Sequence, residues 1–487
     1  MQTVDIDMYT ECFILFDECE KLVQDVHYRD SIREPMNDFF RFQNKALISA
    51  TPIVPEKDSR FDGFMRVLIQ PDYVYRQKLK LITTNNVLET LQEVIEAKRG
   101  TVCIFCNSID SIDSFYRLIP ELSNACTFCS EDGQYKLWKG NRRKKSMMIT
   151  ELERYNFFTS RFYSAVDILC KNPPHVIFVS DLYGAAQSVI DPATEAILII
   201  GRFRGGVNSV THIASIRPEL ECMSSSEIDH WIQGASTIFN GWKAQLARTT
   251  NIGERTLLQE AIGENSYLPY LDENGKPDSF LIANFYEKEQ VKRLYTSADL
   301  LHLAYEQTGY FVFSHEERLM PVSDNERMAI QHRLAKKKRA ELIVRKLEEM
   351  EKMSKATDKK IQKRYQRMLM NLITSTADRY IYDCFCRFGA EFVREADYNE
   401  NKLRTALNVS SEHTIKKSGQ MRTYIQRAFP VGAEISVQEA KSMLRQVYKK
   451  MGLNTGRGIT TKELEQYAEI ENSRNREARM IKILKHK

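Results

Sequence analysis

The hydrophobic pattern of the first 70 residues alternates between short apolar runs and a longer polar segment. The first run, Cys12–Phe16, precedes a mostly polar stretch with helical spacing at residues 20–42, and a second run follows at residues 46–50. Short apolar runs without strict alternation are typical of parallel strands that are covered on both faces. Residues 1–70 are therefore predicted to form a strand, a helix and a second strand.

Residues 72–225 repeat this alternation, with candidate helices such as residues 111–122 between the apolar runs. Five strands are expected here, at Thr101–Phe105, near Cys126–Phe128, and at Tyr155–Thr159, Val176–Ser180 and Val210–Ile213. Strands that alternate with helices predict a doubly wound α/β domain with a parallel sheet.

The strand pattern fades after about residue 225. Residues 226–330 are expected to form a mainly helical accessory region. Residues 331–377 contain no Pro or Gly and carry charges of both signs, which predicts a long charged helix or a helical pair. Residues 378–487 are expected to form a helical basic domain. The predicted fold class is thus α/β, followed by an α-helical C-terminal extension.

The charge is unevenly distributed along the 487 residues. The whole chain has 70 Lys and Arg against 65 Asp and Glu, but residues 331–487 hold 35 of the former and 19 of the latter. The C-terminal third therefore has a net charge of +16 and the rest −11. A basic region on an acidic body predicts a polyanionic partner.

Other features of the composition place the chain among globular proteins. Apolar residues make up 43% of the sequence, and no run approaches the ~18 apolar residues of a membrane span. The N-terminus has no secretion signal, and the ten cysteines do not form the framework of a disulfide-rich protein. We expect a cytoplasmic protein without a membrane partner.

Two carboxylates follow the first predicted strand, in the string Phe13–Glu20. Asp17 and Glu18 would lie at the carboxyl edge of the sheet, where α/β proteins bind their ligands. Nucleotide hydrolysis uses such a pair, one carboxylate holding Mg²⁺ through water and the other polarising the attacking water. The alternative is an acidic loop whose charges favour the start of the next helix.

Four further strings extend this pattern. Ser49-Ala50-Thr51 follows the second strand, and Val102–Asn107, Thr159–Asp167 and Gly201-Arg202-Phe203-Arg204 come later. In this order and spacing, over residues 12–213, the chain resembles the superfamily 2 helicases, the group that includes the DEAD/DEAH-box and herpes-type origin-binding helicases. The resemblance implies RecA-like parallel sheets, one partial (residues 1–70) and one complete (residues 72–225), with ATP and Mg²⁺ as cofactors.

The resemblance also implies roles for individual residues. Asp17 would hold Mg²⁺ through water and Glu18 would activate the attacking water, while Arg202 or Arg204 would reach the γ-phosphate as an arginine finger. Ser49 and Thr51 would couple the nucleotide state to domain movement. Thr159, Ser160 and Asp167 would contact nucleic acid.

The sequence departs from the family pattern in two places. Leu198 stands where the last motif usually has Gln, and Ala196–Ile200 could form a strand instead of the helix that the family has from about Thr194. No Gly-rich loop ending in Lys-Ser/Thr is present to cradle phosphates, and only 16 residues precede Asp17. Three explanations are open: a misassigned start, a split gene or a degenerate enzyme. We expect a missing N-terminal segment that carries this loop, and little ATPase activity from this chain alone.

Two pairs of cysteines have the spacing of a zinc site, Cys103 with Cys106 and Cys126 with Cys129. Each pair lies in an apolar run that predicts a strand. Residues i and i+3 of a strand point to opposite faces, so both sulfurs could not reach one ion. Zinc is not expected.

Two basic clusters are candidates for nucleic-acid contact, although each could equally be a solvated surface. The first contains Trp138, Lys139, Arg142, Arg143, Lys144 and Lys145, and the second Lys336, Lys337, Lys338 and Arg339. Cations suit phosphates, and an aromatic ring can stack on a base.

Residues 429–467 resemble C-terminal segments of helicase–primase replication proteins of bacterial mobile elements, a resemblance that assigns no residue. The predicted function is an ATP-dependent helicase or translocase, with DNA favoured over RNA and replication proteins as possible partners. The alternative is a non-catalytic nucleic-acid-binding subunit that acts through the basic C-terminal helices.

Overall fold

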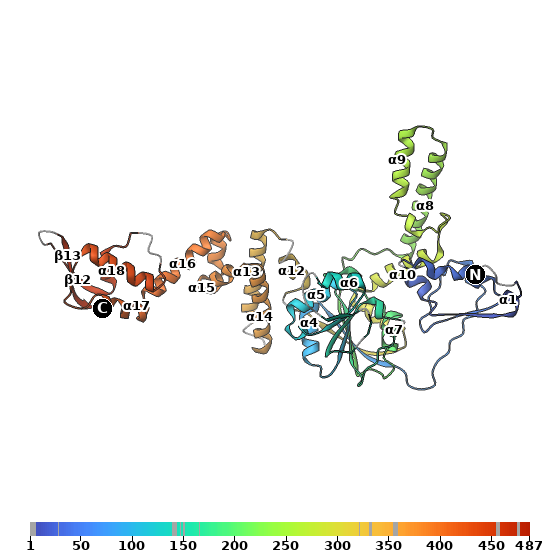
Figure 1. The fold of residues 1–487 in the computed structure, drawn as a ribbon, viewed down its shortest axis with the longest axis horizontal. Coiled ribbons are helices and arrows are strands. Elements are labelled where there is room, and N and C mark those ends of the chain that lie inside the picture. Colours follow the sequence, from blue (N-terminus) through green and yellow to red (C-terminus); the bar gives the residue numbers. More distant parts are fainter. Residues whose placement is uncertain are drawn as a thin grey trace. The chain divides into compact units, whose positions relative to one another are not determined.

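The computed structural model describes the whole chain apart from a small number of short segments. These are residues 1–5, 28, 139–143, 147, 150, 165, 321, 331–333, 354–358, 454–457 and 475–477. The chain divides into two compact units, Met1–Met328 and Ala329–Lys487 (Figure 1).

The first unit is built on a parallel sheet. Among the described residues it has eight strands in the order β10-β3-β9-β8-β4-β7-β5-β6, and every neighbouring pair is parallel. The strands are β3 (Gln77–Thr84), β4 (Val102–Phe105), β5 (Cys126–Phe128), β6 (Lys144–Ser146), β7 (Tyr155–Phe158), β8 (His175–Ser180), β9 (Ser209–Ser215) and β10 (Phe311–Arg318). Five of them coincide with the strands that the sequence predicts, so the mixed α/β class is confirmed.

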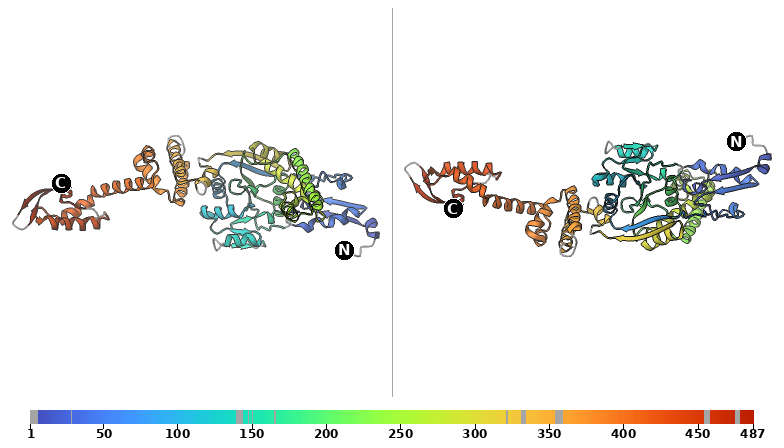
Figure 2. Two further views of the ribbon diagram at one scale, coloured as in Figure 1. Left: turned by 90° about the horizontal axis from the view of Figure 1, so that it is seen from above. Right: turned by 90° about the horizontal axis from the view of Figure 1, so that it is seen from below.

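Helices cover both faces of this sheet (Figure 2). On one face, α4 (Val87–Glu96) and α5 (Ile109–Leu118) pack on Ile104 and Ile177. On the other face, α7 (Glu195–Gly201) and α11 (Ala298–Gln307) enclose Phe105 and Phe178. Burial on both sides explains why these strands read as continuous apolar runs.

A second, smaller sheet holds the N-terminal part of this unit. Strands β1 (Phe13–Asp17) and β2 (Asn44–Ile48) pair in parallel, so that Asp17 lies opposite Ile48. Three helices accompany them: α1 (Ile6–Glu11), α2 (Lys21–Gln24) and α3 (Pro35–Arg41). The inner face of this sheet packs in a core with α2, α3 and the start of α10 (Ser279–Leu294).

Helix α10 joins the two sheets. Phe280 and Leu281 at its start belong to the core of the small sheet, whereas Val291 and Leu294 near its end pack in the core of the large sheet. Residues 226–330 are therefore more than the helical accessory region that the sequence predicts. They contain α8 (Ser225–Arg248), α9 (Ile252–Gly263), α10, α11 and α12 (Asp324–Met328).

Strand β10 corrects that prediction further, because it pairs with β3 over eight residues at the edge of the large sheet. Its sequence, FVFSHEER, ends in five polar or charged residues. An edge strand is only partly buried and gives a weak apolar signal, which is why the pattern did not predict it.

The second unit is mainly helical. Its helices are α13 (Lys336–Met353), α14 (Lys359–Ser375), α15 (Arg379–Glu395), α16 (Glu400–Lys416), α17 (Gly419–Ala428) and α18 (Val437–Lys450). Residues 331–377 thus hold two helices, which is the helical pair of the two alternatives that the sequence left open.

Residues 378–487, for which the sequence predicts a helical domain, contain three strands besides their helices. Strands β11 (Glu434–Ser436), β12 (Ala468–Arg474) and β13 (Arg479–His486) form an antiparallel sheet in the order β11-β13-β12. Strand β13 buries Ile481 and Ile483 while Lys482 between them is exposed. This two-residue period is the signature of a strand with one buried face, and the many lysines obscured it.

Among the residues described, no helix combines the length and the apolar character that crossing a membrane requires.

Candidate nucleotide and nucleic-acid site

The two loops that follow β1 and β2 lie against each other. The Ser49 hydroxyl donates a hydrogen bond of 2.5 Å to Oε2 of Glu20, and the backbone N–H of Thr51 donates to Ser49 Oγ at 2.9 Å. The Cys19 N–H donates to the carbonyl of Ile48. The strings Asp17–Glu20 and Ser49–Thr51, separate in sequence, therefore form one structural element at the carboxyl edge of the small sheet.

Glu20 is the residue of this edge for which the sequence suggested no role. It is fully buried, and burial raises the pKa of its carboxyl above the usual range for Glu. Its Oε1 has no hydrogen-bond partner within the described part of the chain, and neither does the hydroxyl of Thr51. The signal that could have found Glu20 is the third carboxylate in the string Asp17-Glu18-Cys19-Glu20.

Asp17 and Glu18, the two predicted catalytic carboxylates, lie where β1 ends. The Asp17 side chain is exposed, and its Oδ1 accepts a hydrogen bond from the Glu18 N–H at 2.8 Å. Glu18 has a φ of 55°, in the left-handed region that a residue with a Cβ rarely adopts. Such a conformation holds the chain in a sharp turn directly after the strand.

The predicted motifs at Thr159–Asp167 and Gly201–Arg204 also meet. Arg204 Nε donates to Oδ1 of Asp167 at 3.0 Å, and the Ile168 N–H donates to the carbonyl of Arg202 at 2.9 Å. Arg202 lies directly after α7, whose N-cap residue is Thr194. The helix expected from the family resemblance is present, and the strand alternative for Ala196–Ile200 is wrong.

The two hydroxyl residues after β7 differ in their surroundings. Thr159 is buried, and its hydroxyl donates to the carbonyl of Phe128 at 3.4 Å. Ser160 is exposed at the start of a 3₁₀ turn, Ser160–Phe162. Of these two residues, only Ser160 presents its side chain to solvent.

A polar junction connects the small sheet to the motif that carries Arg202. The amide of Gln24, at the end of α2, donates to Oγ1 of Thr194 at 3.0 Å and to Oε1 of Glu287 on α10 at 3.3 Å. Thr194 in turn donates to Oδ2 of Asp191 at 2.6 Å. Nothing in the sequence pattern singled out Gln24, Asp191 or Glu287, because their association depends on α10.

Three carboxyls crowd this junction. Burial raises the pKa of Glu195 to about 8 and that of Glu287 to about 7, and it also raises the pKa of Asp191. Glu195 accepts a hydrogen bond from the Asp191 N–H. The junction is therefore most stable with these carboxyls protonated, and ionisation as the pH rises opposes it.

The junction sets the relation between the predicted acidic pair and the predicted arginines. Residues 17–24 and 194–204 are held together at Gln24 and Thr194. Within the described residues, no hydrogen bond or ion pair joins Asp17 or Glu18 to Arg202 or Arg204. The two groups lie on connected segments without touching.

The first basic cluster falls largely outside the described structure. Lys139, Arg142 and Arg143 lie outside the described residues. For Trp138 in α6 (Glu131–Trp138), and for Lys144 and Lys145 in β6, only the backbone is described.

The second basic cluster is mostly engaged within its own unit. Lys336 pairs with Glu400, Lys337 with Asp397 at 2.7 Å, and Arg339 with Asp378 at 2.6 Å. These ion pairs tie α13 to the segments around α15 and α16. The positive charges that the sequence assigned to nucleic acid are thus largely balanced by carboxylates of the same unit.

The cysteine pair Cys103 and Cys106 has its two side chains on opposite sides of the large sheet. Cys103 packs in the core on the side of α7, and Cys106 in the core on the side of α4 and α5. Across the described residues, no three His, Cys, Asp or Glu side chains are grouped in a way that could hold a metal ion.

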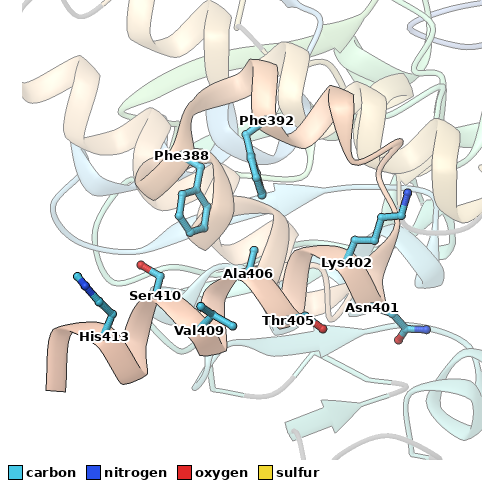
Figure 3. Close-up of a pocket in the computed structure, with 9 residues that line it drawn as sticks. All are labelled: Phe388, Phe392, Asn401, Lys402, Thr405, Ala406, Val409, Ser410 and His413. Carbon is cyan, nitrogen blue, oxygen red and sulfur yellow. The ribbon is translucent and has the colours of Figure 1, made fainter. Parts of the chain in front are cut away.

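A groove in the second unit lies apart from all the predicted motifs. It has a volume of about 740 Å³ between α15 and α16, and its lining includes Phe388, Phe392 and Val409, with Lys402 and His413 among its polar residues (Figure 3). The surface is largely apolar and includes none of the residues that the sequence motifs single out. We therefore place the candidate site in the first unit.

No protein-family model matches the chain, and no curated protein matches it either.

Proposed function

We propose that the chain is part of an ATP-dependent nucleic-acid helicase or translocase of the superfamily 2 type, with DNA as the favoured substrate. In this proposal the small sheet is a portion of the first RecA-like domain and the large sheet is the second. The observation that carries it is that the strings meet in pairs: Thr159–Asp167 contacts Gly201–Arg204 beside the large sheet, and Asp17–Glu20 contacts Ser49–Thr51 at the carboxyl edge of the small sheet. In parallel α/β proteins that edge is where nucleotides bind.

The contacts support separate roles for the two sheets. Asp17 would hold Mg²⁺ through water and Glu18 would orient the attacking water, and the exposed Asp17 carboxylate suits that task. Ser49 donates to Glu20 and accepts from the Thr51 N–H, which fits a role in transmitting nucleotide state. Arg202 and Arg204 follow α7, which Gln24 links to the acidic loop.

Nucleic acid would run across the second domain. Ser160 is exposed just after the carboxyl end of β7, and Asp167 is exposed and already paired with Arg204. A contact of nucleic acid with this pair would act directly on the arginine motif. Thr159 would position the turn that presents Ser160, since its own hydroxyl is bonded to Phe128.

The 487 residues do not contain the whole nucleotide site, because the Gly-rich phosphate loop is absent from the sequence. The small sheet has a matching structural feature. Its outer face exposes Phe13 (63%), Leu15 (54%) and Ile48 (46%), although parallel sheets are normally covered on both faces. We propose that a further polypeptide segment, carrying the phosphate loop, covers this face.

The experiment compares ATP hydrolysis by this chain alone with hydrolysis by a fusion that adds the phosphate-loop half of a superfamily 2 ATPase domain before Met1. The chain alone should show no hydrolysis stimulated by DNA. The fusion should hydrolyse ATP, and Glu18→Gln should abolish this activity. Replacing both Arg202 and Arg204 with Ala should lower the rate by about 10³-fold or more. Robust hydrolysis by the chain alone, or activity of the fusion that survives Glu18→Gln, would contradict the proposal.

The second candidate is a nucleic-acid-binding subunit that does not hydrolyse ATP. The net charge of +16 on residues 331–487 favours it. Binding of DNA that weakens with salt, together with a fusion that folds but never hydrolyses ATP, would select this candidate. None of the ten cysteines, all of which the structure describes, is in a disulfide bond, which suits the cytoplasmic location that we propose for either function, alongside replication proteins.

A further inference from the structure

The last 69 residues of the chain form a small body with its own hydrophobic core and an excess of positive charge. Ile425 of α17, Leu444 of α18, and Ile481 and Ile483 of β13 are buried together in this core. Residues 419–487 contain 14 Lys and Arg against 7 Asp and Glu. The positions of these cations determine whether Asp and Glu side chains of the same body pair with them.

The order of elements in this body is helix, strand, helix and β-hairpin. The strand β11 between the two helices pairs with β13, and β13 pairs with β12, so the sheet order is β11-β13-β12. A short 3₁₀ helix, Thr461–Gln466, precedes the hairpin. This is the topology of a winged helix, a relative of the helix-turn-helix modules that bind DNA.

The hairpin carries two arginines at the positions where they repel each other. Arg474 ends β12, Arg479 begins β13, and the two are direct cross-strand partners. Both side chains are exposed, and neither has an acidic partner within the part of the chain that the structure describes. Like charges directly opposite in a ladder destabilise it.

Helix α18 also places like charges next to one another. Lys441, Arg445 and Lys449 are spaced four residues apart and so lie along one side of the helix. Arg445 and Lys449 are exposed, and Lys441 is partly exposed. None of the three forms an ion pair with a described residue, although like charges at this spacing also destabilise a helix.

These two sets of cations contrast with the cluster on α13. Lys336, Lys337 and Arg339 are each paired with a carboxylate, whereas the arginines of the hairpin and the basic stripe on α18 are not. An arrangement that repels itself in the free protein is stabilised when a polyanion supplies the opposite charge. Phosphates spaced along a nucleic acid are such a polyanion.

The aromatic residues of this body favour a duplex over a single strand. Phe429, Tyr448 and Tyr467 are all buried, and Tyr424 is partly buried. Proteins that bind single strands stack bases on exposed aromatic rings, and this body presents none within its described residues. A two-stranded β-ribbon and a helix are instead the elements whose width fits the major groove of B-form DNA.

We propose that residues 419–487 form a winged-helix-type module that binds double-stranded DNA, with Arg474 and Arg479 of the hairpin and Lys441, Arg445 and Lys449 of α18 contacting the phosphate backbone. This goes beyond the proposed motor and does not depend on it, because the module would bind DNA without ATP. It also moves the main DNA contact of the second unit away from the α13 cluster.

The test measures binding of the full chain to a 20-base-pair DNA duplex without nucleotide, by fluorescence anisotropy across a salt series. Two double variants, Arg474→Gln/Arg479→Gln and Arg445→Gln/Lys449→Gln, each remove two charges. Each should weaken binding about tenfold or more and reduce the slope of log K against log salt by about 1.8, since one phosphate contact contributes about 0.9. Circular dichroism of each variant checks that the fold is kept.

The matched control is Lys336→Gln/Lys337→Gln, which removes the same charge from ion-paired positions and should leave the slope unchanged. Arg474→Lys/Arg479→Lys keeps the charge and should retain most of the slope of log K against log salt. An equal loss of slope in the control, an unchanged slope in both double variants, or tighter binding to a single strand than to the duplex would each overturn the proposal. A motor that fails while this binding persists would reject the proposed function alone.

Discussion

The hydroxyl of Ser49 joins the two loops of the small sheet, and its removal gives a sharp test of the site geometry. In Ser49→Ala the buried Glu20 loses the hydrogen bond to its Oε2, and the Thr51 N–H loses its acceptor. A hydrogen bond to a charged group contributes about 1.5–3 kcal/mol and a neutral one about 1 kcal/mol. We therefore expect local opening of this segment to become easier by about 2–4 kcal/mol.

Hydrogen exchange followed by mass spectrometry measures this opening directly. At a tenfold change for each 1.4 kcal/mol, peptides covering residues 13–25 and 44–52 should exchange about 30- to 1000-fold faster. Peptides from β8 and β9 should not change. Ser442→Ala is the control, because Ser442 is exposed on α18 in the other unit and should leave all of these peptides unaffected.

A second substitution distinguishes the loss of this hydrogen bond from a general loss of packing. Glu20→Leu replaces the buried carboxyl with an apolar side chain of similar size, so Ser49→Ala should destabilise the segment less in that background than alone. Replacing both partners of a buried hydrogen bond is close to neutral, whereas removing one leaves the other unsatisfied. Effects that simply add, within about 0.5 kcal/mol, would refute the contact between Glu20 and Ser49.

Three other predictions follow from the first unit. His212 is buried, and burial lowers its pKa to about 3, so the free energy of unfolding should fall as the pH drops below 6.5, by about 2 kcal/mol at pH 5. Urea unfolding should show this loss, and the His212→Gln variant should lack it. Glu195 and Glu287 have pKa values raised from 4.5 to about 8 and about 7, so the opposite sign applies: stability at the junction with α2 should fall as the pH rises from 4.5 to about 8. Hydrogen exchange in α2 and α7, corrected for its intrinsic pH dependence, should show this trend, and a Glu195→Gln/Glu287→Gln variant should lack it. Arg204→Ala breaks an exposed ion pair with Asp167 and should change the unfolding free energy by less than about 1 kcal/mol, so a larger loss in thermal or chemical unfolding would show that the pair supports the fold.

Local patterns in the sequence predicted much of the first unit. The apolar runs at residues 101–105, 126–128, 155–159, 176–180 and 210–213 all became strands of one parallel sheet, because strands buried on both faces require such runs. The order of the motifs also placed Asp17, Ser49 and Thr159 at strand ends. Each of these inferences depends only on neighbours along the chain.

Local patterns did not predict strands β13 and β10, and the reason is physical. Strand β13 alternates Lys with Ile and Leu, and in a sequence rich in charge this resembled one face of a helix. Strand β10 lies at a sheet edge, where little of its surface is buried, so its sequence carries little apolar signal. Its pairing with β3 depends on contacts across more than 200 residues of sequence, which no local pattern contains.

Charge was visible in the sequence, but its use was not. The excess of Lys and Arg after residue 331 follows from composition alone, and it pointed to a polyanionic partner. Only the tertiary structure separated Lys336, Lys337 and Arg339, which carboxylates of distant helices neutralise, from Arg474 and Arg479, which face each other across a hairpin. Likewise, the sequence alone determined that the chain carries carboxylates after a strand and arginines near a glycine pair. The junction of Gln24, Thr194 and Glu287, in contrast, exists only because α10 packs against both sheets. Secondary structure depends on the local pattern of residues, but pairing of charges and polar groups depends on which surfaces the fold brings together.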